Sequence, residues 1–385
     1  MRKPIYLDYA ATTPVATSVA EAMMACLTQD GIFANPASRS HLLGWQAEEK
    51  VEEARNQVAE LIGADPREIV WTSGATEANN LALKGAAENY RFHNPTGGHL
   101  IVSAIEHKAV LDPAHWLEAQ GFDVTFIAPD EYGFIDPKKI EASLRADTFL
   151  VSVMLVNNEL GAINDLAAIG DICRRKNILL HSDGAQAAGK IAIDVEKLNV
   201  DLLSLSAHKF YGPKGIGALY VRRAPEVNIA AQVHGGGHER KMRSGTLPTH
   251  QIVGMGAAAS LAKTSLAEDE KRILLLREKL WEGIKHIPGI RRNSANSNTV
   301  AGILNIAFAH QDGEMLLIAL RDLAISSGSA CNSASMSPSY VLKAIGLEND
   351  IAQASLRVSL GRYTQEDEIK FAIETICSVL AKLSA

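Results

Sequence analysis

Between about residue 68 and residue 222, short apolar runs alternate with amphipathic segments of helical length, and few folds are compatible with this rhythm. Runs rich in Val, Ile and Leu, separated by helix-length segments, are typical of a mostly parallel sheet with helices on both faces. The expected strands are 68–72, 100–103, 124–128, 149–156, 178–182, 201–205 and 217–221. Ligands of open α/β sheets bind beyond the carboxyl ends of the strands, so the residues that follow each strand are the first candidates for function.

The chain of 385 residues is long enough for two domains, and its pattern changes after about residue 262. A helix is predicted over 46–62, with Gly63 as its C-terminal cap. The elements expected after residue 262 are a charged helix at 267–287, a strand at 302–308, a helix near Glu314 and a final helix from Gln365. We therefore predict a large α/β domain over 16–262 and a smaller α+β domain made of 1–15 and 263–385.

Charge, hydropathy and cysteine usage argue against several classes of protein. The 38 Lys and Arg are interspersed with 44 Asp and Glu, whereas nucleic-acid binding needs a concentrated basic surface. No stretch reaches the roughly 18 consecutive apolar residues of a membrane span, and the first residues contain no apolar signal segment. The four cysteines show no CxxC spacing, so no disulfide framework is expected. We expect a cytoplasmic protein that binds neither nucleic acid nor membrane.

The first candidate for chemistry is Lys209, which follows the apolar strand at 201–205 and precedes a glycine-rich turn. A lysine at a strand end can form a Schiff base with a carbonyl compound. Most lysines are solvated surface charges, so Lys209 carries little weight by itself.

A second candidate, Asp183, ends another strand, far enough ahead of Lys209 for one helical crossover to a parallel strand. Its carboxylate suits the ring nitrogen of pyridoxal phosphate, which has to stay protonated for the ring to act as an electron sink. In isolation, an N-cap at a strand–helix turn explains Asp183 equally well.

A third candidate is the run Thr72-Ser73-Gly74-Ala75-Thr76-Glu77, which follows a strand and opens a helix. Its small residues let backbone N–H groups approach an anion, and a helix start of this kind can hold a phosphate. The motif is weak alone, because Thr-x-x-Glu is also an ordinary capping box. It gains weight because a phosphate cradle, a ring-nitrogen partner and a Schiff-base lysine would all fall at strand ends.

The serine-rich run 326–335 surrounds Cys331 with small residues and no apolar anchor, which predicts an exposed, mobile loop. The other cysteines, Cys26, Cys173 and Cys377, lie on apolar helix faces and are interpreted as small hydrophobic residues. Cys331 is therefore the candidate nucleophile, which can approach a cofactor-bound sulfur and then present it to an acceptor.

Together these residues resemble the cysteine desulfurase family, pyridoxal-phosphate enzymes of fold type I, along almost the whole chain. Further matching segments are 6–14, 35–41, 106–108, 156–159, 234–240 and 243–246. The long loop around Cys331 resembles the housekeeping subgroup, which supplies sulfur for iron–sulfur cluster assembly and tRNA thiolation. The resemblance implies a homodimer whose large domain has a mostly parallel seven-stranded sheet, and whose smaller α+β domain carries the cysteine loop.

The resemblance also implies the role of each site residue. Lys209 is expected to hold pyridoxal 5'-phosphate through a Schiff base, Asp183 to pair with the ring nitrogen, and Gln186 to bind the ring hydroxyl. His107 is expected to stack on the ring. Asn158 is expected near the ring oxygen and the substrate, whose carboxylate Arg357 binds. The expected phosphate ligands are Ala75, Thr76, Ser206, His208 and Thr246 of the partner subunit.

The activity implied is conversion of L-cysteine to L-alanine, with Lys209 moving the α-proton and the Cys331 thiolate attacking the substrate sulfur. His107 is a candidate base for Cys331, because the thiolate is the reactive form of cysteine. The persulfide left on Cys331 is expected to pass to an iron–sulfur scaffold protein or other acceptors, and Cys331 to ligate a cluster at most transiently.

The sequence departs from the family in two places. Ser182 and Gly184 replace the usual Val and Ala, while Asp183 and Gln186 remain. The chain ends at Ala385, where housekeeping members have a further tail that helps to dock the scaffold, so the acceptor is left open.

Alternative functions on the same scaffold are an aminotransferase, which has no use for Cys331, and a selenocysteine lyase. A sulfur carrier without turnover is disfavoured by the complete set of Lys209, Asp183, His107 and Cys331. His234 and His238 are separated by three glycines and have no further ligand nearby, so no resident metal is expected.

Overall fold

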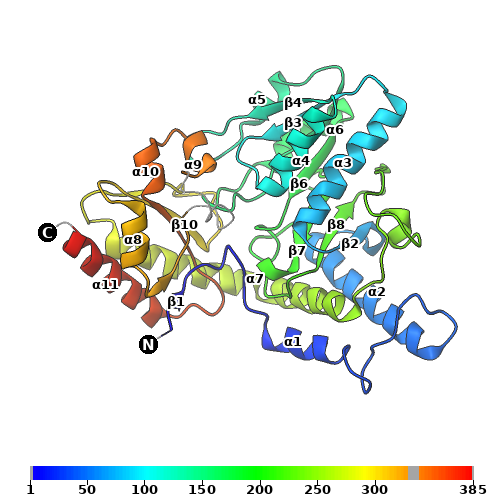
Figure 1. Cartoon of the computed structure of the whole chain (residues 1–385), viewed down its shortest axis with the longest axis horizontal. Helices are drawn as coiled ribbons and strands as arrows, with labels where there is room; N and C mark the ends of the chain where they lie inside the picture. Colours follow the sequence, from blue (N-terminus) through cyan, green and yellow to red (C-terminus); the bar gives the residue numbers. More distant parts are fainter. Residues whose placement is uncertain (1–2, 328–337, 384–385) are drawn as a thin grey trace.

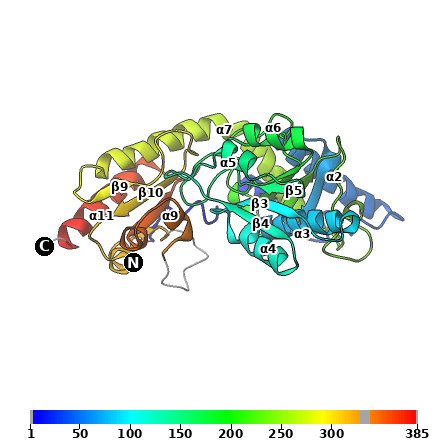
Figure 2. The same ribbon diagram turned by 90° about the horizontal axis from the view of Figure 1, so that it is seen from above.

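The computed structural model describes residues 3–327 and 338–383. It shows a larger lobe built on a central sheet and a smaller lobe that contains both ends of the chain (Figure 1). One long helix, α7 (Thr249–Ile284), runs along both lobes (Figures 1 and 2). The candidate site lies between the lobes.

The central sheet confirms the predicted seven-stranded, mostly parallel architecture. Strand β8 is antiparallel to both of its neighbours, whereas the remaining hydrogen-bonded pairs are parallel. In spatial order the strands are β2 (Ile69–Thr72), β8 (Gly217–Val221), β7 (Leu202–Ser206), β6 (Leu179–Asp183), β5 (Thr148–Ser152), β3 (His99–Ser103) and β4 (Asp123–Ile127).

Helices cover both faces of this sheet, because most of its strands are buried on both sides. Neighbouring residues of β3 pack into different cores: Leu100 and Val102 face one, and Ile101 faces the other. The first core includes α3 (Ala75–His93) and α4 (Lys108–Ala119), and the second includes α2 (Leu42–Ile62), α6 (Leu166–Lys176) and the first half of α7. The shorter helices α1 (Thr17–Met24) and α5 (Pro137–Ala142) complete the larger lobe.

The smaller lobe is built on an antiparallel sheet of order β12-β10-β9. A separate two-stranded parallel sheet pairs the start of the chain with β11, and a third apolar core lies between the sheets, the second half of α7 and α11. The elements are β1 (Ile5–Tyr6), β9 (Ile290–Arg292), β10 (Ile303–Phe308), α8 (Gly313–Ala319), β11 (Leu323–Ala324), α9 (Tyr340–Ala344), α10 (Asn349–Gln353), β12 (Ser355–Ser359) and α11 (Glu366–Leu383).

The helix expected over 267–287 is the second half of α7, which begins at Thr249, much earlier than the sequence indicated. Residues 249–262 show no alternation of apolar and polar faces, because this half of α7 consists largely of small residues that are buried against the rest of the larger lobe. A Cβ at Gly256 would lie 2.6 Å from the Cα of Ala54 in α2, so the two helices need glycine to approach this closely. The expected domain boundary after residue 262 falls inside α7, and the division into domains stays a prediction.

The strand expected over 149–156 is also shorter, because β5 ends at Ser152. The next residues are no longer part of the strand, but two of their backbone N–H groups still bond to β6. Val153 N donates to His181 O at 3.1 Å, and Leu155 N donates to Asp183 O at 3.1 Å. This irregular stretch carries the chain to Asn158, beside the end of β6.

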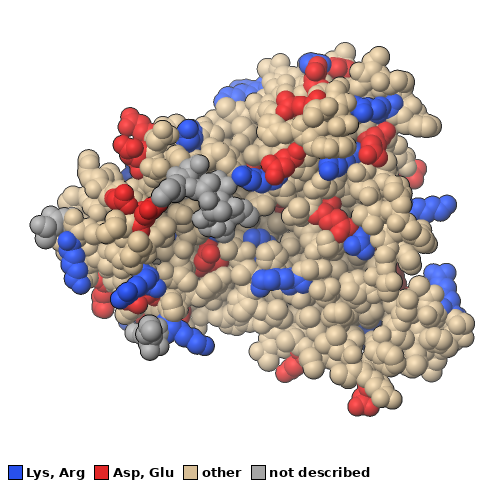
Figure 3. All heavy atoms as spheres, in the orientation of Figure 1, with Lys and Arg blue, Asp and Glu red and all other residues tan. Residues whose placement is uncertain are grey.

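Lys and Arg are interspersed with Asp and Glu over the face of the molecule shown in Figure 3. Among the helices of residues 3–327 and 338–383, none combines the length and apolar character needed to cross a membrane.

A buried ion pair fixes the edge strand β2 next to the loop that leads to Thr246. The guanidinium of Arg55 donates to both carboxylate oxygens of Glu239, at 2.8 and 2.9 Å, and to Ile69 O at 2.8 Å. Glu239 also accepts from Trp71 N at 2.9 Å. The pair therefore supplies partners for backbone groups of an edge strand, which has no neighbouring strand on that side among the described residues.

We expect Glu239→Ala to lower the free energy of unfolding by about 3–5 kcal/mol, because it removes the buried carboxylate partner of Arg55 and leaves only the exposed Glu52 to pair with that buried charge. Denaturant unfolding measures the change. Glu52→Ala is the matched control: Glu52 pairs with the same arginine at 3.0 Å but its side chain is 54% exposed, so the expected loss is below about 1 kcal/mol. Equal unfolding midpoints for the two variants would contradict this account.

Candidate active site

Polar side chains gather where the central strands end, and the smaller lobe lies against them to leave a cavity of about 440 Å³. Asp183 and Ser206 are the last residues of β6 and β7. Arg357 enters from β12 of the smaller lobe, and Ala10 and Ala11 enter from the segment that follows β1. The cavity thus lies where an open α/β sheet offers a binding site, at the carboxyl ends of its strands.

The structure brings together most of the residues that the sequence predicted for one site. Those that line the cavity are Ala75, Thr76, His107, Asn158, Asp183, Gln186, Ser206, His208, Lys209 and Arg357. Thr246 does not line the cavity of its own chain, and Cys331 lies outside the described residues. Residues that the sequence did not single out but that also line it include Ala10, Ala11, Met154 and Lys214.

Lys209 lies in a short 3₁₀ turn, Ala207–Lys209, directly after β7. Its Nζ donates to the backbone carbonyls of Ala10 at 2.8 Å and Ala11 at 2.7 Å. These carbonyls belong to a segment that Ser359 of β12 holds in place, because its hydroxyl accepts from Ala10 N at 2.9 Å. The smaller lobe therefore positions the acceptors of the candidate Schiff-base lysine.

Asp183 is buried at the end of β6. One carboxylate oxygen accepts from Asn79 Nδ2 of α3 at 2.7 Å, and the other accepts from Ala185 N at 2.9 Å. The contact with Ala185 N belongs to a turn. No helix begins between β6 and β7, all of whose connecting residues the structure describes, so the N-cap interpretation of Asp183 and the helical crossover expected there were wrong. Asn79 was missed in the sequence, because a single Asn in a helix gives no signal that it reaches a neighbouring strand.

The start of α3 presents backbone N–H groups to the cavity. The N-cap residue is Gly74, which has no side chain to accept hydrogen bonds from these N–H groups. The carboxylate of Glu77 instead accepts a hydrogen bond from Ser73 N at 2.8 Å. Glu77 is in turn paired with Arg243 at 2.7 Å, which offsets its negative charge. The capping contact is therefore present at a helix start of the kind that can hold an anion.

His208 extends this part of the cavity as a neutral imidazole. Burial, and then the neighbouring lysines 209, 214 and 190, lower its pKa to about 4. Its Nδ1 lies 3.1 Å from the hydroxyl of Thr12, so the ring is oriented by the N-terminal segment.

His107 is the N-cap of α4, and its Nδ1 accepts from Ala109 N at 3.1 Å. This contact places the proton of the neutral ring on Nε2. Burial, helped by the charge of Lys209, lowers the pKa of His107, so the neutral form persists to lower pH than in a solvated histidine. To act as a base His107 has to take its second proton at Nδ1, at the expense of the bond to Ala109.

Arg357 is 2% exposed and bridges the lobes. It donates to Asn158 O at 2.9 Å and to the carboxylate of Asp8 at 2.9 Å. Its Nε and the side-chain Oδ1 of Asn158 are buried without a hydrogen-bond partner in the described part of the chain. Buried polar atoms of this kind need a partner, and a polar ligand in the cavity would supply one.

The ends of the segment that contains Cys331 are held beside this site. Ser326 exchanges backbone hydrogen bonds with Arg357, at 3.2 and 2.7 Å. After the undescribed residues, the Ser339 hydroxyl donates to the buried carboxyl of Glu159 at 2.6 Å. Within residues 3–327 and 338–383, no cluster of three or more His, Cys, Asp or Glu is placed to hold a metal ion.

Residues 5–371 match the model of the aminotransferase class-V family. The chain is 60% identical over 383 residues to the cysteine desulfurase IscS of Shewanella baltica (strain OS223), a match that covers 100% of this chain and 94% of the relative. The cysteine desulfurase IscS of Proteus mirabilis (strain HI4320) is 59% identical with the same coverage.

Solved structures agree with these relatives. A NifS-like protein superposes with a TM-score of 0.91 at 36% identity, covering 99% of this chain and 100% of its own. SspA in complex with cysteine superposes with a TM-score of 0.83 at 41% identity, covering 94% of this chain and 100% of its own. Matches of this length and identity leave one conclusion: the chain belongs to the aminotransferase class-V family, among its cysteine desulfurases.

Proposed function

We propose that this chain is a cysteine desulfurase, which takes sulfur from L-cysteine, releases L-alanine and holds the sulfur as a persulfide on Cys331. The observation that carries the proposal is the convergence of Lys209, Asp183 and Arg357 on one cavity of a class-V chain. Relatives named cysteine desulfurase and a structural neighbour solved with cysteine support the reaction and the substrate.

The cavity fits pyridoxal 5'-phosphate, on which this family depends. It combines a lysine amine for the aldehyde, a carboxylate for the ring nitrogen, and a helix start with hydroxyl and imidazole groups for the phosphate. When bound, the cofactor supplies an electron sink for the α-carbon of an amino acid.

The proposed roles follow from the place of each side chain around the cavity. Lys209 would hold the cofactor through its side-chain amine and would move a proton at the α-carbon of the substrate. Asp183 keeps the ring nitrogen protonated, while Asn79 fixes the orientation of its carboxylate. Gln186 would donate to the ring oxygen, and His107, the N-cap of α4, would cover the ring.

The phosphate would be held by the start of α3, at Ala75 and Thr76, and by Ser206 and His208, all of which line the cavity. Thr246 of the partner subunit completes this set in a homodimer. Thr246 does not reach the cavity of its own chain. Large exposed apolar side chains also support a subunit interface; they lie on α1, the connection that follows it and the first turns of α2, at Met24, Leu27, Phe33, Leu42, Leu43 and Trp45.

Substrate recognition is assigned to Arg357 and Asn158. The guanidinium fork of Arg357 suits a carboxylate, and its unpaired Nε offers a donor for one. Because Asn158 O accepts from the same guanidinium, the two residues hold each other beside the ring.

In the sulfur step, the thiolate of Cys331 attacks the substrate sulfur. A sulfur–sulfur bond forms as the carbon–sulfur bond breaks, and the carbon that loses sulfur gains a proton, so no external oxidant or reductant is needed. The contacts of Ser326 and Ser339 hold the chain on both sides of Cys331 next to Arg357 and Glu159. An iron–sulfur scaffold protein, and acceptors for tRNA thiolation, are the proposed destinations of the sulfur.

The deciding experiment combines the visible spectrum of the purified protein with product assays. We expect a cofactor band in both wild type and Cys331→Ala, but alanine and sulfide formation from L-cysteine only in wild type. Cys377→Ala is the control, since Cys377 lies on α11 of the smaller lobe. Alanine formation by Cys331→Ala would indicate a lyase that needs no loop cysteine, and a missing cofactor band would overturn the proposal.

The pH dependence of persulfide formation tests His107. If neutral His107 deprotonates Cys331, the single-turnover rate falls with acid through a pKa below the ordinary histidine value, because burial disfavours the charged ring. We expect His107→Gln to lose this acid limb and to slow the step by roughly 10²–10⁴-fold. Persulfide formation at the wild-type rate in His107→Gln would exclude the role of base.

A further inference from the structure

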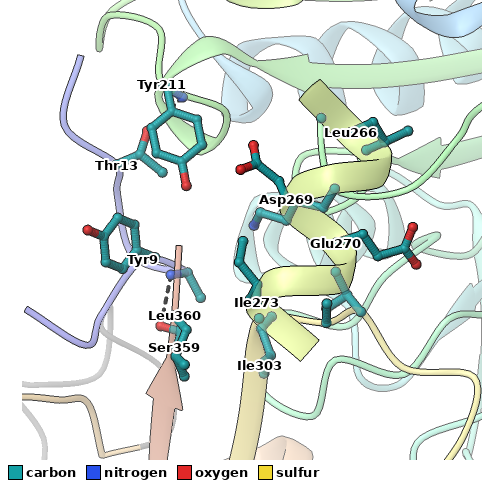
Figure 4. Close-up of a pocket in the computed structure, with 16 residues that line it drawn as sticks. Tyr9, Thr13, Tyr211, Leu266, Asp269, Glu270, Ile273, Ile303, Ser359 and Leu360 are labelled. Atoms are coloured by element: carbon teal, nitrogen blue, oxygen red, sulfur yellow. Dashed lines mark hydrogen bonds between the residues drawn. The ribbon is translucent and has the colours of Figure 1, made fainter. Parts of the chain in front are cut away.

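Lys190 contacts Gln186 of the candidate site but does not itself line the larger cavity, and the proposed chemistry does not use it. Lys190 follows Gln186 closely in the sequence, and the backbone between the two residues forms consecutive turns. The side chain lines a second, small cavity of about 40 Å³ between the N-terminal segment and α7. Figure 4 shows this cavity, with Tyr9 and Tyr211 on one side and Asp269 and Ile273 on the other.

The ammonium of Lys190 is enclosed by protein and donates to the side-chain Oε1 of Gln186. The other end of the same amide, Nε2, donates to Ala10 O at 2.8 Å. Ala10 O also accepts from Lys209 at 2.8 Å. A continuous chain of hydrogen bonds therefore runs from Lys190 through Gln186 and Ala10 to the candidate Schiff-base lysine.

Both neighbours of the Gln186 amide specify the same orientation. A lysine ammonium can only donate, so the carbonyl end of the amide faces Lys190, and a backbone carbonyl can only accept, so the NH₂ end faces Ala10. The NH₂ group has a second N–H, and Gln186 lines the larger cavity. Lys190 thus holds the amide with a donor available to a ligand there, and polarises that donor.

The charge of Lys190 has no carboxylate beside it in the part of the chain that the structure describes. In residues 3–327 and 338–383 no carboxylate lies within ion-pair distance of its ammonium, and the closest charge effects come from the cations Lys209 and Arg357. Burial, followed by these cations, lowers the pKa of Lys190 well below its ordinary value. A buried charge without a partner is costly, so an anionic group on the far side of Gln186 would stabilise it.

The remaining titratable groups around Lys190 do not compensate it. His208 is held neutral by burial and by the lysines around it. Across the small cavity lie Tyr9 and Tyr211, whose phenol pKa values are raised, and the acids Asp269 and Glu270 of α7. Asp269 is paired with Arg362 at 2.7 Å. The compensating anion is therefore best supplied by the ligand of the larger cavity.

We propose that Lys190 is a positioning residue for the cofactor: it fixes the Gln186 amide so that an N–H faces the ring oxygen, and it places a positive charge behind that amide. This inference rests on the proposed function. Lys190 does not touch the reacting atoms, and its effect on them passes through Gln186 and through the electrostatic field at Lys209.

The test compares wild type with Lys190→Met, Lys190→Gln and Lys190→Arg, using the affinity of the apoprotein for pyridoxal phosphate and the pH midpoint of the visible band. Removing the charge-assisted bond should weaken binding roughly tenfold or more in Lys190→Met. The midpoint should move to higher pH in both Met and Gln variants, because a positive charge near the Lys209 nitrogen lowers the pKa of that nitrogen. Lys190→Arg should restore the wild-type midpoint.

A remote lysine, Lys197, provides the control, since Lys197→Met should change neither quantity. Wild-type affinity and midpoint in the Met and Gln variants would overturn the inference, as would a loss of thermal stability with an unchanged midpoint. If Lys190→Met does not fold, the pH midpoints of the visible band in Lys190→Gln and Lys190→Arg decide between the two outcomes. A wild-type protein without any cofactor band would instead overturn the proposed function, so the two failures are distinguishable.

Discussion

The backbone carbonyl of Ala10 is the acceptor on which the arrangement of the site depends. It accepts from Lys209 and from Gln186, both at 2.8 Å, and so fixes a lysine amine and a side-chain amide relative to each other. Ala10 itself is held through its N–H by Ser359 of the smaller lobe. Lys209, in the turn that follows β7, is therefore oriented by a segment from the opposite lobe, and this arrangement exists only when the lobes are packed together.

Two further features keep the lobes in this position. Helix α7 packs into the core of the larger lobe with its first half and into the core of the smaller lobe with its second half. Arg357 joins Asp8 of the N-terminal segment to Asn158 of the larger lobe. Because Arg357 and Asn158 both line the cavity, a ligand bound there would be coupled to the relative position of the lobes through Arg357.

Much of this could be predicted from sequence, because the signals are local. Strand ends followed by Asp183, Ser206 and Lys209 identify the site through the rule that ligands bind at the carboxyl ends of strands. The first half of α7 could not be predicted, because its small residues reflect close packing on α2, which leaves no amphipathic pattern. Asn79 and Lys190 could not be identified from the sequence for another reason. Each matters through one contact, with Asp183 and with Gln186 respectively, and the periodicity of the sequence does not reveal such contacts.

Several lysines lie close to the cavity, and we propose that Lys209 is the one that holds the cofactor. Borohydride reduction of the protein loaded with pyridoxal phosphate, followed by peptide mapping, locates the modified amine directly. We expect one modified residue, Lys209, whose ammonium donates to the carbonyls of Ala10 and Ala11 at the cavity. Modification of Lys190 or Lys214 in place of Lys209, or no modification at all, would contradict this proposal.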